Sequence, residues 1–322
     1  MKGLILLAGG LLIYGLLGLL VGWRTVATQL TMLPPGLWLL AVLLVLLGHL
    51  LLFGRWQLLL GSLGHRLESR ASAAIYLAGL GLMAAPARSG EALRGLWLQR
   101  RHRIPLRIGV AATAAERLLD LASALGVLAW GLGLGRQRAA LAAVLLGLGG
   151  LVWLISHPQT LRRAERLLSR PPLGRRWHGL HRVLWEGMQA MAELRGLLRP
   201  RPLLLGLVLT SAVWLLEAVL LQRLLSELGA SVNLEQAGVM RTATSLGGVV
   251  SLLPAGLGTS ELTSVGLAIL YGANQGQALA ATLVLRAVTL LLPSLIGALS
   301  LLAQPDLQRL RRSDADRARS NS

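Results

Sequence analysis

The sequence contains no cysteine among its 322 residues, which excludes disulfides, thiolate metal sites and cysteine nucleophiles. It is also poor in charge: 14% of its residues are charged, whereas 54% are hydrophobic. Soluble domains carry about 25% charged residues, and the uninterrupted apolar runs of this chain are longer than a buried core helix needs. We therefore predict an all-α, polytopic integral membrane protein.

Six apolar runs are long enough to cross a hydrocarbon core of about 30 Å at roughly 1.5 Å per residue. They are 3–22, 36–60, 108–131, 139–156, 203–225 and 278–303. The first is followed by no clear signal-peptidase site, so we interpret it as a membrane helix. Two further apolar regions, 71–99 and 237–272, are interrupted by Pro and Gly, and at least one of their arms is too short to cross. We predict that each is a re-entrant helical hairpin.

The basic residues predict the orientation of the chain. With the amino terminus inside, 22 of the 32 basic residues fall in cytoplasmic segments, and only Arg24, Arg136 and Arg138 fall in external loops. Basic residues flank the first hairpin on both sides, whereas the flanks of the second contain none. The two hairpins are therefore predicted to enter from opposite sides of a bacterial inner membrane, with both termini cytoplasmic.

We predict a single transmembrane domain, residues 1–303, with two repeat halves at about 36–131 and 203–303, each of which contains one hairpin. The spacing from Glu91 to Glu116 equals that from Glu261 to Arg286, which predicts an inverted repeat. The amphipathic segment 157–201 joins the halves, and we expect it to lie on anionic lipid at the cytoplasmic surface. The basic tail, 304–322, is predicted to be disordered.

Ionisable residues at membrane depth are costly and need a partner or a task. In "ERLLDL", Glu116 and Asp120 lie one turn apart, and Arg117 can pair with Asp120. This group is either a self-neutralised cluster or part of a site, and both interpretations stay open. Glu217 has no obvious local partner, and Arg286 could pair with any of the acids.

The two breaks allow two interpretations that do not exclude each other. Ser89, Thr259 and Ser260 are good amino-terminal caps, and Glu91 and Glu261 follow in the first helical turn, where the helix dipole favours carboxylates. Alternatively, a half-helix amino terminus near arginines is an anion site. Arg88, Arg94 and Arg241 lie close in sequence, and a lipid phosphate is the obvious anion at that depth.

Sequence motifs give little support for catalysis. The chain has neither a paired-Asp motif for magnesium nor an HExxH motif for zinc, and its six histidines are isolated from plausible nucleophiles. His49, within a membrane span, is expected to hydrogen-bond to a neighbouring helix. We expect no enzymatic activity, no cofactor and no metal.

The segments "PARSGEALR", "ERLLDL" and "LLPAGLGTSE", with an arginine in the membrane helix that follows, resemble a known family. It is the flippase-like family named after the transmembrane region of bacterial lysylphosphatidylglycerol synthetases, and the resemblance covers roughly residues 5–303. It implies a protein that moves or presents lipids, here a stand-alone member without the synthetase domain. Its motif positions in this chain are Pro86, Arg88, Gly90, Glu91, Arg94, Glu116, Arg117, Asp120, Pro254, Gly256, Gly258, Glu261 and Arg286.

Together these features predict a lipid translocase in which opposed hairpins form a polar midplane site for a phospholipid or lipid-linked anionic headgroup. In this hypothesis three arginines attract the phosphate: Arg88, Arg94 and Arg286. Four acids balance charge or accept protons: Glu91, Glu116, Asp120 and Glu261. The remaining predicted binding residues are Arg117, Gly90, Gly256 and Gly258. The alternative is a non-transporting, lipid-binding partner of a separate glycosyltransferase or lipid-modifying enzyme; a nucleic-acid partner is not expected.

Overall fold

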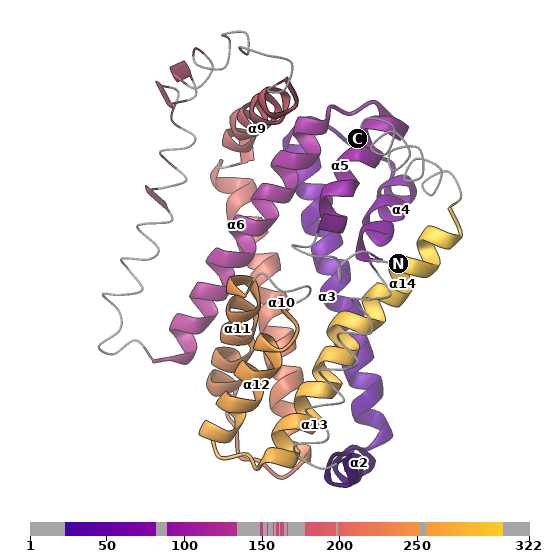
Figure 1. Ribbon diagram of the computed structural model, residues 1–322, viewed down its shortest axis with the longest axis vertical. Helices are drawn as coiled ribbons and strands as arrows, with labels where there is room; N and C mark the ends of the chain where they lie inside the picture. The colour runs from indigo at the N-terminus through magenta and orange to yellow at the C-terminus, as the bar shows by residue number, and fades with distance from the viewer. Residues whose placement is uncertain are drawn as a thin grey trace.

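A computed structural model describes residues 23–81, 89–133, 178–197, 199–251 and 256–304, together with a few isolated positions between 149 and 166. These residues form helices and contain no strand (Figure 1). The helices are α2 (Trp23–Met32), α3 (Pro35–Ser62), α4 (Ser69–Leu80), α5 (Ser89–His102), α6 (Leu106–Gly131), α9 (His178–Leu197), α10 (Pro200–Glu227), α11 (Leu234–Val250), α12 (Thr259–Leu270), α13 (Gln275–Arg286), the π-helical turn η4 (Ala287–Leu291) and α14 (Leu292–Leu302).

Within the described residues, three helices are long and apolar enough to cross a membrane: Pro35–Ser62, Pro200–Glu227 and Gln275–Leu302. They correspond to three of the predicted spans. The predicted span at 108–131 is the long helix α6, which carries four charged side chains. The spans predicted at 3–22 and 139–156 lie wholly or mostly outside the described residues, as does the tail. The protein is a helical membrane bundle, as the composition predicted.

The two longest helices, α3 and α10, pack side by side and begin and end in the same way. Each has a proline in its first turn, where the missing N–H costs no helical hydrogen bond. After the last turn, Gly64 and Gly229 adopt φ values of 81° and 86°. In both cases the following N–H donates back to the helix, from His65 to Leu60 and from Ala230 to Leu225. Similar local signals thus delimit the first long helix of each half.

The two broken regions form helical hairpins at opposite ends of the bundle (Figure 1). The first consists of α4 and α5, and the second of α11 and α12. Each hairpin packs on the last long helix of the other half, because α4 contacts α14 and α11 contacts α6. The helices that precede α3 and α10 cross over likewise, with α2 on α13 and α9 on α6. The packing is thus reciprocal between the two halves, and both the inverted repeat and re-entry into the membrane stay predictions.

The contact between the first hairpin and α14 is a glycine pair. A Cβ atom on Gly81 would lie 2.7 Å from the carbonyl carbon of Gly297, and one on Gly297 would overlap the backbone of Gly81. Only hydrogen side chains therefore allow these two backbones to approach so closely, as in other tightly packed membrane helices.

The loops before α11 and α13, both predicted to be external, lie at the same end of the bundle. Asn233 and Asn274 cap these helices through capping boxes with Gln236 and Gln277. The Gln277 side-chain amide also donates to the Leu228 carbonyl at 2.6 Å, which ties the two loops together. Uncharged polar residues thus satisfy the backbone at this end, where basic residues are scarce.

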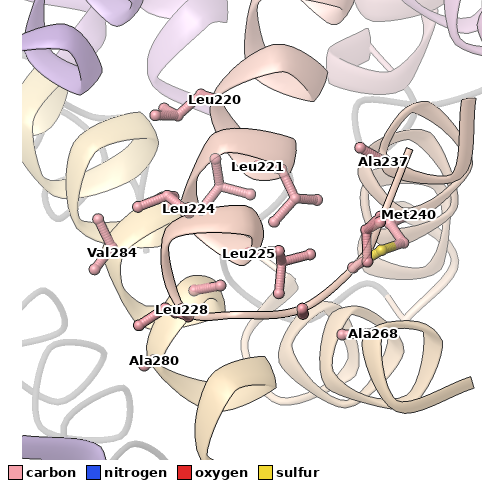
Figure 2. Packing of buried hydrophobic residues seen from close by; sticks show 14 of the residues in the cluster. Leu220, Leu221, Leu224, Leu225, Leu228, Ala237, Met240, Ala268, Ala280 and Val284 are labelled. Carbon is pink, nitrogen blue, oxygen red and sulfur yellow. The ribbon is translucent and has the colours of Figure 1, made fainter. Parts of the chain in front are cut away.

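The largest apolar core of the described residues lies where α10 packs against α11 and α13, and Ala268 of α12 belongs to the same cluster (Figure 2). Four leucines of α10 are almost completely buried there: Leu220, Leu221, Leu224 and Leu225. Helix α2 closes the same end against α13, with Leu30 packed on this core. Arg24 was expected in an external loop, but it lies in the helix α2, which begins at Trp23.

Candidate functional site

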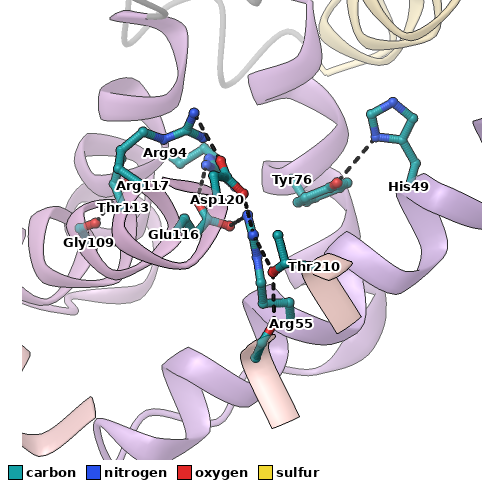
Figure 3. A network of polar contacts seen from close by, with 11 residues as sticks. His49, Arg55, Tyr76, Arg94, Gly109, Thr113, Glu116, Arg117, Asp120 and Thr210 are labelled. Carbon is teal, nitrogen blue, oxygen red and sulfur yellow. Dashed lines mark hydrogen bonds and ion pairs between the residues drawn. The ribbon is translucent and has the colours of Figure 1, made fainter. Parts of the chain in front are cut away.

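A network of buried charges centres on Arg55, near the carboxyl-terminal end of α3 (Figure 3). Its Nη1 lies 2.5 Å from the Asp120 carboxylate and 2.8 Å from the Thr210 hydroxyl, and its Nη2 lies 3.6 Å from Glu116. The Arg55 side chain is 3% exposed. One guanidinium therefore links α3, α6 and α10, and its charge is compensated by two carboxylates, as burial of an ion requires.

Arg94 of α5 completes this network from the first hairpin. Its Nη2 lies 2.5 Å from Glu116, and its guanidinium lies over the Trp56 ring, 4.6 Å from the centroid. The Tyr76 ring lies on the same guanidinium at 5.7 Å, so aromatic faces add to the stabilisation of the cation. Arg94 is 4% exposed. It holds the hairpin to α6 and is itself largely enclosed.

The prediction that Arg117 pairs with Asp120 is confirmed, with Nη1 3.1 Å from the carboxylate. The network of Arg55, Arg94, Glu116, Arg117 and Asp120 thus contains three guanidiniums and two carboxylates. Both acids lie on one face of α6, as their spacing predicted, and both contact Arg55. The cluster that the sequence suggested on α6 is therefore connected to α3 through Arg55, to α5 through Arg94, and through Arg55 to Thr210 of α10.

In the second half, Glu261 lies in the first turn of α12, directly after the break between α11 and α12. Its Oε2 accepts a hydrogen bond from the Gly258 N–H at 2.6 Å, and its Oε1 accepts one from Arg286 Nε at 2.7 Å. Glu261 is fully buried. The carboxylate thus pairs with a free backbone N–H at the amino terminus of α12 and neutralises Arg286 of α13. Among the acids that the sequence offered, Glu261 is therefore an ion-pair partner of Arg286.

The caps expected in this hairpin are shifted by one residue. The N-cap of α12 is Gly258, with φ 87° and ψ −58°, a conformation that costs little only for glycine. Thr259 is already helical, and its hydroxyl donates to the Gly256 carbonyl at 3.1 Å. The Ser260 hydroxyl donates across the hairpin to the Thr244 carbonyl at 3.3 Å. The side chain that accepts a hydrogen bond from the N-cap N–H is therefore Glu261, not Thr259 or Ser260, because the turn points the Gly258 N–H at the Glu261 carboxylate.

A partly enclosed cavity of about 100 Å³ lies between the halves, near the middle of the long helices. It is lined by α3, α10, α11 and η4. Its polar lining residues are His49, Glu217, Arg241 and Thr289, and its other walls are apolar or glycine. A cavity that holds one water needs roughly 10–15 Å³ on this measure, so this one has room for several.

The charged pair of the cavity joins α10 to α11. Arg241 Nη2 lies 2.7 Å from Glu217 Oε2, and the Arg241 guanidinium lies 5.0 Å from the centroid of the Trp214 ring. The Arg241 and Glu217 side chains are 16% and 20% exposed, more than those of Arg55 and Glu116. Arg117 and Asp120 of the Arg55 network are more exposed still, at 39% and 23%. What distinguishes the Glu217–Arg241 pair is that both side chains line the cavity.

His49 connects the cavity to the first hairpin. Its Nδ1 lies 3.3 Å from the Tyr76 hydroxyl of α4 (Figure 3), which confirms the expected hydrogen bond to a neighbouring helix. Tyr76 in turn lies over Arg94. Polar side chains thus lead from the cavity to the Arg55 network.

The structure separates the predicted site residues into two clusters. Arg94, Glu116, Arg117 and Asp120 belong to the Arg55 network. Gly256, Gly258 and Glu261 belong to the second hairpin, and Arg286 of α13 pairs with Glu261. Gly90 and Glu91 lie in the first turn of α5, but their surroundings, like all of Arg88, Pro86 and Pro254, are outside the described part of the chain. Their assignment to substrate binding stays a prediction.

Two features of the site were missed in the sequence. Arg55 was not singled out, although an arginine within a predicted membrane span is itself a signal of function or pairing. Glu217 and Arg241 were noted separately. They lie 24 residues apart on two helices joined by a loop, and no local spacing rule pairs them. Their pairing depends on how α10 and α11 fold back on each other.

The fold and these ion pairs define a polytopic helical membrane protein with buried ion pairs between its helices. The model of the family described as lysylphosphatidylglycerol synthase TM region matches residues 6–297, and the chain belongs to this family. No curated protein matches the chain. Membership places the protein in the membrane and links it to lipid-related function, in agreement with the resemblance found in the motifs.

Proposed function

We propose that this protein moves a phospholipid, or another lipid with an anionic headgroup, between the leaflets of the bacterial inner membrane. The cavity between the halves is the observation that carries the proposal. It combines a guanidinium, a carboxylate and apolar walls at the middle of the bundle. A lipid headgroup carries a phosphate that a guanidinium binds well, and its chains stay among apolar surfaces.

Three observations support this use of the cavity. The cavity lies between the two halves, as the binding sites of inverted-repeat transporters do. Thr289, in its lining, belongs to the π-helical turn η4, and such turns recur at functional sites. Each hairpin packs on a helix of the other half, α4 on α14 and α11 on α6, so a movement of one half relative to the other would displace both hairpins. In this proposal Arg241 is the primary phosphate ligand, and Arg94 and Arg286 stabilise the hairpins.

The test is lipid movement by the full-length protein in reconstituted vesicles. Fluorescent phosphatidylglycerol is incorporated, and dithionite bleaches only the outer leaflet unless the protein exchanges lipid between leaflets. We expect the wild type to expose nearly all of the label, and Arg241→Gln to lose this activity. The matched control is Arg107→Gln, which removes an arginine paired with Glu193 at 3.0 Å but outside the cavity. Normal exchange by the Arg241 variant would contradict the proposal.

The same assay separates transport from lipid presentation to a separate lipid-modifying enzyme. A protein that binds phosphatidylglycerol and moves none of it in vesicles would support presentation. The polar cavity would then serve as a holding site rather than as a step on a path across the membrane.

A further inference from the structure

The Glu217–Arg241 pair differs from the other ion pairs of the bundle in its surroundings. Glu261 receives hydrogen bonds from both Gly258 and Arg286, and it is fully buried. Glu217 lines the cavity, and among the described residues the structure gives its carboxylate Arg241 alone as partner. A ligand that enters the cavity therefore contacts this pair directly.

An anion that enters the cavity competes with Glu217 for Arg241. If Glu217 stayed ionised after losing Arg241, an uncompensated carboxylate would remain among the apolar side chains of α3 and α10, which is strongly unfavourable. Two anions cannot share one guanidinium in such surroundings without a repulsive cost. Protonation of the carboxylate removes both costs, because the neutral acid no longer repels the anion and can donate a hydrogen bond to it.

Other titratable groups near this pair are held differently. His49 of α3 faces the same cavity, and Tyr76 of α4 reaches it through His49. On α6, which also packs on α10, Glu116 and Asp120 are bound by the arginines of the Arg55 network. Helix α13 contributes Arg286, which is bound to Glu261 of α12. In the described cavity lining, Glu217 is the carboxylate and His49 the imidazole.

We infer that Glu217 is a proton-binding group, and that uptake of one proton by its carboxylate releases Arg241 to bind the anionic headgroup. The inference rests on the proposed function, since it takes the headgroup as the ligand of Arg241. The proton comes from water, an O–H bond forms on Glu217, and the guanidinium keeps its charge. One anion and one proton enter together, so the net charge of the cavity is unchanged.

This exchange predicts a linkage between proton uptake and lipid binding. The probe is dihexanoyl phosphatidylglycerol, whose phosphodiester stays anionic throughout the neutral pH range, added to the purified full chain in weakly buffered micelles. A pH indicator reports proton uptake, calorimetry reports binding, and protein-free micelles provide the blank. We expect about one proton per bound lipid, and an affinity that falls up to about tenfold per pH unit as pH rises.

Three variants assign the proton to its group. Glu217→Gln keeps a hydrogen-bond acceptor for Arg241 but cannot take up a proton, so it should bind the lipid with no uptake and with affinity independent of pH. His49→Gln should retain the uptake. Glu227→Gln, an exposed change on the same helix, should behave as the wild type.

The outcomes distinguish this inference from the proposed function. Lipid binding by the wild type without proton uptake, and with an affinity independent of pH, overturns the inference and leaves the proposed function standing. Failure of the wild type to bind the lipid at any pH overturns both. Loss of uptake in His49→Gln with normal uptake in Glu217→Gln overturns the assignment to Glu217. The wild-type stoichiometry decides the main point even if a variant fails to fold.

Discussion

The Arg55 network makes a strong prediction about stability, because Arg55, Arg94 and Glu116 are buried. Replacing Glu116 with methionine keeps the side-chain volume similar but removes the carboxylate that contacts both Arg94 and Arg55. Three guanidiniums then face the single carboxylate of Asp120. Removing one partner from a buried ion pair typically costs about 3–5 kcal/mol, and we expect a loss of this size in the free energy of unfolding.

The second half of the test removes the stranded charge. In the double variant Arg94→Met, Glu116→Met, the pair is replaced by apolar side chains, and we expect the new side chain at position 94 to pack on Trp56 and Tyr76, which Arg94 contacts in the wild type. Apolar replacements of buried ion pairs are often neutral, so most of the lost stability should return. The expected coupling in the double-mutant cycle is at least about 2 kcal/mol.

The measurement is reversible unfolding of the purified protein in mixed micelles, titrated with sodium dodecyl sulfate and followed by tryptophan fluorescence. The control is Glu193→Met, which breaks the Arg107–Glu193 pair, whose side chains are 43% and 33% exposed. Exposed pairs contribute about 0–1 kcal/mol, so this variant should lose little stability. If Glu116→Met costs no more than Glu193→Met, or if the double variant is as unstable as the sum of the singles, the reasoning is refuted.

Two further predictions concern packing and topology. Gly297→Leu places a side chain against the backbone of Gly81, and we expect a loss of about 1–3 kcal/mol in the same unfolding assay. Gly126→Ala, in a helix with open space at the Cβ position, should be neutral or stabilising by contrast. For topology, single cysteines at Ser231 and Ser69 in the cysteine-free chain are labelled in whole cells with an impermeant maleimide. Labelling at Ser231 with protection at Ser69 is expected, and the reverse pattern would invert the predicted orientation.

Where sequence reasoning succeeded, the signals were local. The prolines and glycines that delimit the long helices act through their own backbone preferences, so the breaks near 86–91 and 254–261 were visible in the sequence. The Arg117–Asp120 pair follows from helical spacing, and the acids of α6 share a face for the same reason. Such interactions depend on residues three or four positions apart, and a helix fixes their geometry.

Where it fell short, the partners were distant in the chain. Arg55 lies 61 residues or more from its two acids, and α3 and α6 must pack before the three can meet. Opposite charges attract at any sequence separation, so the sequence offers Arg286 several acids and no means of choosing among them. Backbone geometry made that choice: the turn at Gly258 orients Glu261 toward both its own helix terminus and Arg286.

The sequence by itself determined that this protein is a helical membrane bundle, that two of its regions are broken, and which family it resembles. Hydrophobicity, helix-breaking residues and charge bias act through composition and short spacing, and none of them requires knowledge of which helices touch. Only the tertiary structure decided which charges neutralise one another and where the polar cavity lies. Those outcomes depend on helix packing across the two halves, which brings Glu217 to Arg241 beside His49 and leaves space for a ligand between them.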